Sequence, residues 1–159
     1  MEYPLVDAFV TAWDNHSADA LRATMSEDAI YEVVPQGRSF GPDKLGEQVG
    51  FMQSLSSDFS MSIESVLRDG NRYAVEWALM GTNDGPFGPL HLEASGRSFR
   101  VRGAWIIETE NSKITLCRAY WDFAGLLRQI DASHGGQVAW QMALWSEEHS
   151  SGMPTTEEN

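Results

Sequence analysis

One carboxylate, Asp122, stands among apolar side chains where a predicted strand gives way to a predicted helix, in the stretch "CRAYWDFAGLLRQI". Alternate side chains of a strand share a face, so Arg118 and Tyr120 are expected to point the same way as Asp122. Apolar surroundings oppose ionisation of a carboxylate, whereas a nearby guanidinium favours it. An aspartate in a cavity, whose ionisation is opposed by apolar walls and favoured by an arginine, is a candidate general acid and base.

The same position also suits a structural role for Asp122. An aspartate at the start of a helix caps the free backbone N–H groups of the first turn. Capping and catalysis are compatible, and the residues alone leave both open. A cap requires only the helix "FAGLLRQI", whereas catalysis requires that Asp122 face a cavity large enough for a substrate.

Other kinds of catalytic site are not indicated. The four histidines are scattered over different segments, and Cys117 is the only cysteine, so no metal-ligand spacing is present and no metal is predicted. We find no Ser/His/Asp arrangement and no glycine-rich phosphate loop. We also predict that chemistry at Asp122 needs no cofactor.

The elements expected around Asp122 follow from periodicity. Two short N-terminal helices, a short strand "AIYEVVP" and a helix "DKLGEQVGFMQSLSS" are followed by two hairpins, which turn at "DGN" and "ENSK". The stretch "QGRSFGPDKLG" is predicted to be a loop. This order predicts an α+β fold in which helices cover one face of a curved antiparallel sheet. Such a cone has an open mouth that suits a small molecule.

Three stretches resemble the SnoaL-like polyketide cyclases of the NTF2-like superfamily, over roughly residues 5–130. They are "YAVEWALMGTNDGPF", "SGRSFRVRGAWIIETENSKI" and "AYWDFAGLLRQI". The resemblance implies an NTF2-like cone over residues 1–134, with residues 135–159 as a C-terminal helical extension and acidic tail. It also implies an aldol-type ring closure on a polyketide or polycyclic aromatic substrate, with Asp122 as general acid and base. A homodimer through the outer sheet face is expected as well.

Two departures from related patterns limit what the resemblance implies. Asn83 stands where the family often has histidine, so a titrating imidazole is lost there while a hydrogen-bond donor is kept. Limonene-type epoxide hydrolases share a similar closing aspartate but add an Arg and a second Asp on a middle strand. The comparable stretch "VEWALM" lacks that pair, which disfavours epoxide hydrolysis. A related isomerase, dehydratase or hydroxylase, or a non-catalytic binding dimer, remains the alternative.

A substrate-binding set is predicted around Asp122. Its members are aromatic side chains that could grip planar rings and polar side chains near the expected mouth. They are Arg118, Tyr120, Trp105, Trp77, Asn83, Tyr31, Phe51 and His91. Trp77 and Trp105 are expected to be core residues first and pocket walls second. Tryptophan side chains that fill the cone would favour a binding module over an enzyme.

The composition of the chain limits which classes of partner are expected. The formal net charge is −12 over 159 residues, which disfavours nucleic acid and anionic membranes as partners. No apolar run approaches the roughly 18 residues of a membrane span. The N-terminus lacks the basic segment of a signal peptide, and the single cysteine fits a cytoplasmic protein. The expected partner is therefore a hydrophobic small-molecule substrate.

Overall fold

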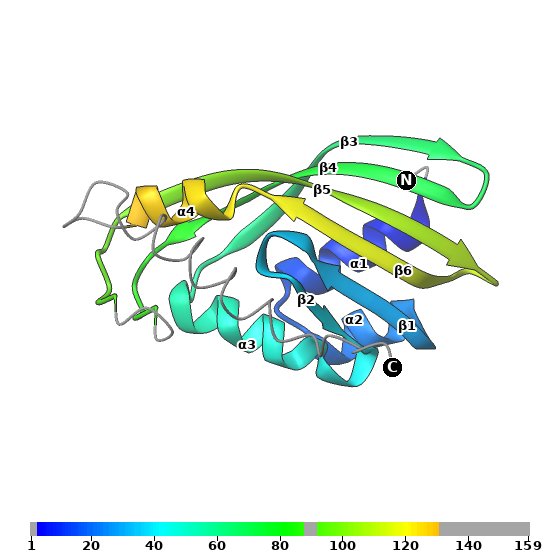
Figure 1. The fold of residues 1–159 in the computed structure, drawn as a ribbon, viewed down its shortest axis with the longest axis horizontal. Helices are drawn as coiled ribbons and strands as arrows, with labels where there is room; N and C mark the ends of the chain where they lie inside the picture. The colour runs from blue at the N-terminus through cyan, green and yellow to red at the C-terminus, as the bar shows by residue number, and fades with distance from the viewer. Residues whose placement is uncertain (1–2, 88–91, 131–159) are drawn as a thin grey trace, which may run out of the picture.

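The computed structural model describes residues 3–87 and 92–130, which are built around one curved sheet (Figure 1). In this described part the sheet has six strands in the order β2-β1-β6-β5-β4-β3. The strands are β1 (Met25–Val33), β2 (Arg38–Phe40), β3 (Ser60–Asp69), β4 (Arg72–Thr82), β5 (Ser98–Glu110) and β6 (Lys113–Trp121). The helices are α1 (Pro4–Asp14), α2 (Ala18–Thr24), α3 (Leu45–Leu55) and α4 (Phe123–Ile130), with short 3-10 turns η1 (Val34–Gln36) and η2 (Pro42–Lys44).

The two long hairpins turn where the sequence predicts. Gly70 has φ of 59° between β3 and β4, and Asn111 and Ser112 have φ of 49° and 61° between β5 and β6. Positive φ matches the right-handed twist of the strands that flank a tight hairpin turn. Glycine and asparagine adopt it at low cost, which is why "DGN" and "ENSK" indicate turns.

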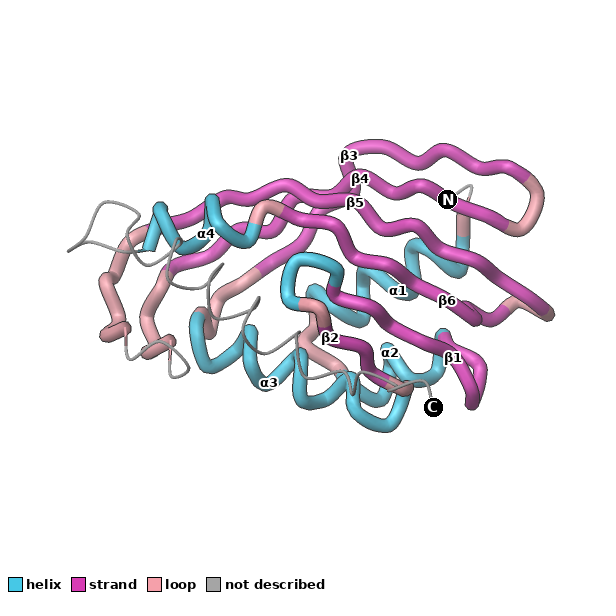
Figure 2. Tube along the Cα trace, viewed as in Figure 1, coloured by secondary structure: helices cyan, strands magenta, loops and turns pink. Residues whose placement is uncertain are grey.

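Helices α1, α2 and α3 gather on one side of the sheet (Figure 2). Their starts and faces follow the sequence. The Ser17 side chain accepts a hydrogen bond from the Ala20 N–H at 3.2 Å, so the predicted N-cap of α2 is confirmed. The predicted apolar stripe of α1 is buried through Val6, Phe9 and Trp13. The α+β cone predicted from the sequence is therefore confirmed.

The sheet differs from the prediction in two ways. It is mixed rather than wholly antiparallel, because β1 pairs with β6 in parallel, with Tyr31 opposite Cys117. The segment predicted as a loop also contains β2 and η2. Only Phe40 of the three β2 residues is buried, so the segment carries too little alternation to indicate a strand.

The core lies between the helices and the concave face of the sheet. Its largest fully buried side chains are Trp105, Phe9 and Phe59. Among the described residues, no helix is long and apolar enough to cross a membrane. The helix predicted after Gly136 and the domain boundary near residue 135 lie outside the described residues.

Candidate functional site

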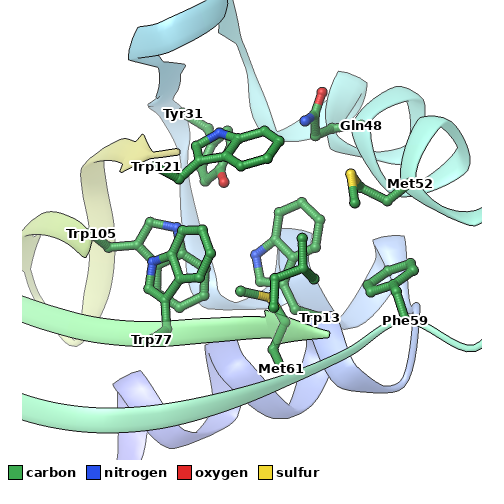
Figure 3. Close-up of a pocket in the computed structure, with 10 residues that line it drawn as sticks. Trp13, Tyr31, Gln48, Met52, Phe59, Met61, Trp77, Trp105 and Trp121 are labelled. Carbon is green, nitrogen blue, oxygen red and sulfur yellow. The ribbon is translucent and has the colours of Figure 1, made fainter. Parts of the chain in front are cut away.

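A narrow pocket opens between the concave face of the sheet and helices α1 and α3 (Figure 3). Aromatic and thioether side chains dominate its walls. The lining residues are Trp13, Tyr31, Gln48, Met52, Phe59, Met61, Trp77, Leu79, Trp105 and Trp121. The cavity has a volume of about 30 Å³, which is room for roughly two water molecules.

A glycine on the central strand makes room for two of the walls. Gly103 of β5 lies in register between Trp77 on β4 and Trp121 on β6. A Cβ at this position would come within 2.4 Å of the Trp77 ring and 2.7 Å of the Trp121 Cβ. The missing side chain therefore allows both indoles to lie over the middle of the concave face. Gly103 therefore shapes this pocket.

The aromatic walls support one another. The Trp77 and Trp105 rings lie 5.2 Å apart between centroids, and Phe9 meets Trp105 edge-on at 4.9 Å. Trp13 and Tyr31 are 5.8 Å apart. Such tilted and edge-to-face pairs stabilise the arrangement beyond the area they bury. The walls near the sheet are therefore part of the core, as the sequence analysis allowed for Trp77 and Trp105.

Buried polar groups also line the pocket. Gln48 on α3 is only 5% exposed and brings an amide to the pocket lining. The indole N–H groups of Trp13, Trp77 and Trp105 are buried and unpaired within the part of the chain that the structure describes. Burial raises the pKa of the Tyr31 phenol well above its ordinary value, so this hydroxyl stays neutral. The described lining residues carry no carboxylate and no imidazole.

Asp122 lies outside this pocket. Its side chain is 58% exposed, and its Oδ1 accepts a hydrogen bond from the Gly125 N–H at 2.7 Å. Its Oδ2 lies 3.8 Å from Nη2 of Arg128. The carboxylate therefore caps α4, which is the structural role that the sequence left open. Its catalytic role stays a prediction, and the apolar cavity expected around it is not found at this position.

Arg118 and Tyr120 lie on the outer face of the sheet rather than in the cone. Arg118 pairs with Glu32 at 3.3 Å and reaches Glu108 at 4.0 Å, and Tyr120 is 45% exposed. The alternation predicted for β6 is correct, but the inward-facing set is Cys117 and Ala119, which are buried, and Trp121, which is half-buried. Apolar side chains occupy the inner face because burying an arginine there would leave its charge poorly solvated.

Asn83 is fully engaged in the fold. Its amide nitrogen donates to the carbonyls of Leu55 and Gly85, at 3.2 and 2.8 Å. Its oxygen accepts from the backbone and hydroxyl of Ser95, at 2.8 and 2.9 Å. The side chain is 1% exposed, so it holds loops together and does not face the pocket.

The remaining predicted binding residues divide three ways. Tyr31, Trp77 and Trp105 line the pocket, and their role in binding a substrate stays a prediction. Phe51 is half-buried against Phe87, with ring centroids 5.3 Å apart, outside the lining. His91 lies outside the described residues.

Several pocket residues were not predicted from the sequence. They are Trp13, Gln48, Met52, Phe59, Met61, Leu79 and Trp121. The alternation of β6 could have found Trp121, since it shares a face with the apolar Cys117 and Ala119. Gln48 lies one helical turn from Leu45 and Met52, on the apolar side of α3. A polar residue within an apolar stripe is the signal that indicates it.

A metal site is not found in the described part of the chain. There, no three His, Cys, Asp or Glu side chains are grouped to hold an ion. The expectation of a site without metal or cofactor stays a prediction.

The chain is similar in sequence to proteins of one known family. The family model for SnoaL-like polyketide cyclases matches residues 4–130. A curated relative, epoxide hydrolase EphG of Mycobacterium tuberculosis, is 30% identical over 131 residues, which cover 80% of each chain.

Solved structures share the fold. A candidate SnoaL-like polyketide cyclase from Jannaschia sp. CCS1 superposes with a TM-score of 0.72 at 18% identity, covering 82% of this chain and 92% of that one. IdmH, a candidate polyketide cyclase from Streptomyces antibioticus, gives 0.71 at 16% identity, covering 79% and 95%. A protein with a ketosteroid isomerase-like fold from Catenulispora acidiphila, in complex with trimethylamine, gives 0.69 at 20% identity, covering 79% and 91%. At these identities the likeness concerns the fold alone.

Proposed function

Because the chain belongs to the SnoaL-like polyketide cyclase family, we propose that it binds a small, planar, mostly apolar molecule in the pocket of the cone and acts on it without a cofactor. One observation carries this proposal. Aromatic rings wall a space that the buried Gln48 amide and the neutral Tyr31 hydroxyl also line. Small-molecule sites typically combine apolar walls with a few polar groups that fix orientation.

The size of the pocket limits the ligand. Trp77 and Trp105 are fixed by the core, but Met52 and Met61 are flexible thioether side chains that adapt to a guest. The described lining residues carry no formal charge, which favours a neutral ligand. A fused-ring substrate needs these methionines to move aside or must extend past Trp121 at the edge of the pocket.

The reaction that fits the family is an aldol-type ring closure. Asp122 directly follows the pocket residue Trp121 but lies outside the pocket, so this reaction requires a substrate that extends past the Trp121 indole to reach the carboxylate. Asp122 would take a proton from a carbon flanked by carbonyls, and the resulting carbanion would attack a second carbonyl of the same molecule. The protonated Asp122 would then return its proton to the new alkoxide, which restores the carboxylate.

A second candidate function is binding without turnover. The exposure of Asp122 and its hydrogen bond to Gly125 favour this alternative, because a capping carboxylate in water is not activated by burial. The tryptophans that occupy much of the cone favour it as well. Binding and catalysis make different demands on Asp122, so one variant separates them.

The test uses the full chain and Asp122→Asn. Asparagine keeps the size of the side chain and an oxygen that can accept from the Gly125 N–H, but it cannot shuttle a proton. With anthraquinone- and polyketide-type esters as substrates, the variant should lose about a hundredfold or more in turnover while binding persists. Arg128→Gln, which removes the ion-pair partner of Asp122, serves as the control and should retain turnover. Equal turnover by Asp122→Asn and the unchanged protein would refute the catalytic assignment.

The same measurements address epoxide hydrolysis. The relative EphG is named for that activity, but β4 of this chain carries Glu76 and Trp77 where an Arg and Asp pair would be needed. We expect styrene oxide to be hydrolysed no faster with the protein than in buffer. Sustained turnover of styrene oxide would favour the hydrolase function over the cyclase function.

The outer face of the sheet is the surface on which we expect a homodimer. Ile30 and Tyr120 are 49% and 45% exposed there, beside the ion pairs of Arg118. Exposed apolar side chains next to compensated charges suit a contact between identical faces. Light scattering should give twice the mass of the chain. Tyr120→Glu should reduce it to the monomer mass, whereas Ser54→Glu on α3, which adds the same charge, should not. A monomeric unchanged protein would exclude this dimer.

A further inference from the structure

Three hydrogen-bond donors in the pocket lack acceptors. The Nε1 atoms of Trp13, Trp77 and Trp105 are buried, and none meets a partner with hydrogen-bond geometry in the described part of the chain. The Trp105 N–H lies close enough to the Tyr31 hydroxyl to oppose slightly the rise in the pKa of that phenol, so Trp13 and Trp77 are the most clearly unpaired. An indole N–H can only donate. Leaving a buried donor unpaired forfeits its hydrogen bond to water without a replacement, and native structures contain few such groups without a reason. Three around one cavity indicate an occupant that accepts hydrogen bonds.

The three indoles come from separate parts of the fold. Trp13 lies in the last turn of α1, whereas Trp77 and Trp105 lie on the neighbouring strands β4 and β5, and all three line the same space (Figure 3). Gln48 adds a buried amide from α3. Chance packing would more readily leave one donor unpaired than three donors from different elements. The common location is therefore a property of the pocket.

The polarity of these groups selects between ligand classes. Aromatic walls alone suit either a planar ring or a cation held over ring faces. The hydrogen end of an N–H dipole is positive, so three unpaired donors oppose a cation and favour an oxygen that carries partial or full negative charge. The neutral Tyr31 hydroxyl can donate as well.

We infer that Trp13, Trp77 and Trp105 form a donor cluster that binds a carbonyl or enolate oxygen of a planar ligand in the cone. This inference rests on the proposed function, since it concerns the same pocket, and it adds the chemical class of the ligand. In an aldol-type reaction the cluster would hold the oxygen on which negative charge develops. Preorganised donors in a site that excludes water stabilise such a charge strongly.

The test compares two ligands with the same ring frame. 1-Indanone has one carbonyl acceptor, and indane has none. Calorimetry on the unmodified full chain should give about tenfold tighter binding of 1-indanone, the effect of about one net hydrogen bond. Tetramethylammonium should not bind. This ligand series needs no variant, so the inference can be refuted even where a substitution prevents folding.

Variants then locate the donors. Trp→Phe at positions 13, 77 and 105 removes each N–H, and Trp121→Phe is the matched control. Trp121 lines the same pocket but is not among the buried unpaired donors. At least one of the three substitutions should weaken 1-indanone binding about tenfold relative to indane, whereas Trp121→Phe should weaken both ligands alike. Chemical unfolding identifies any variant that fails to fold.

The outcomes separate the two proposals. Equal affinity for 1-indanone and indane refutes the donor cluster and leaves the binding pocket intact. Binding of tetramethylammonium also refutes the cluster. A carbonyl preference that all four variants retain refutes the assignment to these indoles. If neither ring compound binds, the proposed function fails and the donor cluster fails with it.

Discussion

The two faces of strand β6 have opposite chemistry although they share one backbone. Cys117, Ala119 and Trp121 face the cone and are mostly buried. Arg118 and Tyr120 face outward, where Arg118 joins a line of ion pairs through Glu32 and Glu108 that continues to Arg72. The inner face is held by packing and the outer by screened charges. Equivalent substitutions on the two faces should therefore change the free energy of unfolding by very different amounts.

The largest effect is expected from Trp105→Ala on the inner face. Trp105 is 1% exposed and packs against Phe9 and Trp77. Removing a buried aromatic side chain should lower the free energy of unfolding by about 3–5 kcal/mol, measured by urea titration. Tyr120→Ala on the outer face should change it by about 1 kcal/mol or less. Similar losses for both variants would contradict the distinction between the faces.

The next effect is expected from Gly103→Val. The new side chain would overlap the Trp77 ring and the Trp121 Cβ, so overpacking should cost about 1–3 kcal/mol. It should also abolish ligand binding in the pocket. Gly41→Val is the matched control, because a Cβ there meets nothing within 4 Å and φ is −76°. An unchanged melting temperature for Gly103→Val would mean that the indoles can rearrange freely.

A smaller effect is expected from Arg118→Gln. The ion pairs of Arg118 involve side chains that are each more than a third exposed, so solvent screens them. The free energy of unfolding should fall by about 1 kcal/mol or less, and the difference should shrink in 1 M NaCl. A loss that persists at high salt would show that packing, rather than charge, holds the outer face.

The smallest effect concerns two carboxylates at the end of β4. The hydrogen bond from the Thr82 N–H lowers the pKa of Asp58, and those from the Ser57 hydroxyl and N–H lower the pKa of Asp84. Because both pKa values are lower in the folded chain, the stabilisation is present above the unfolded value, near 4, and is lost as pH falls below it.

Asp58→Asn tests that dependence. The variant should be less stable than the unchanged chain at pH 7, and the two unfolding curves should converge as pH falls below about 4, where Asp58 becomes protonated. Urea titrations from pH 2.5 to 7 measure this. A constant difference across that range would exclude Asp58 as a source of acid sensitivity.

Much of the fold could be predicted because its signals are local. The turns at Gly70 and Asn111 need positive φ, and Ser17 caps a helix with its own side chain. The parallel pairing of β1 with β6 joins segments far apart in sequence, and no local pattern encodes which strands meet.

The candidate site was harder to predict. The closing motif makes Asp122 the predicted catalytic residue. Burial favours the alternate side chains of β6, so Trp121 faces the cone and the Asp122 side chain is exposed. Trp13 is predictable as an apolar helix residue, but whether it packs solidly or borders a cavity depends on the neighbouring elements. Unpaired donors can be recognised only once the partners of every buried polar atom are known.

The parallel pairing of β1 with β6 has a consequence for the order of folding. The hairpins β3–β4 and β5–β6 close short loops and can form early, whereas Tyr31 meets Cys117 only after most of the intervening chain is in place. Trp13 and Tyr31 come from the N-terminal elements, so we expect the pocket to be completed late in folding. A ligand in it should therefore slow unfolding while leaving the folding rate unchanged.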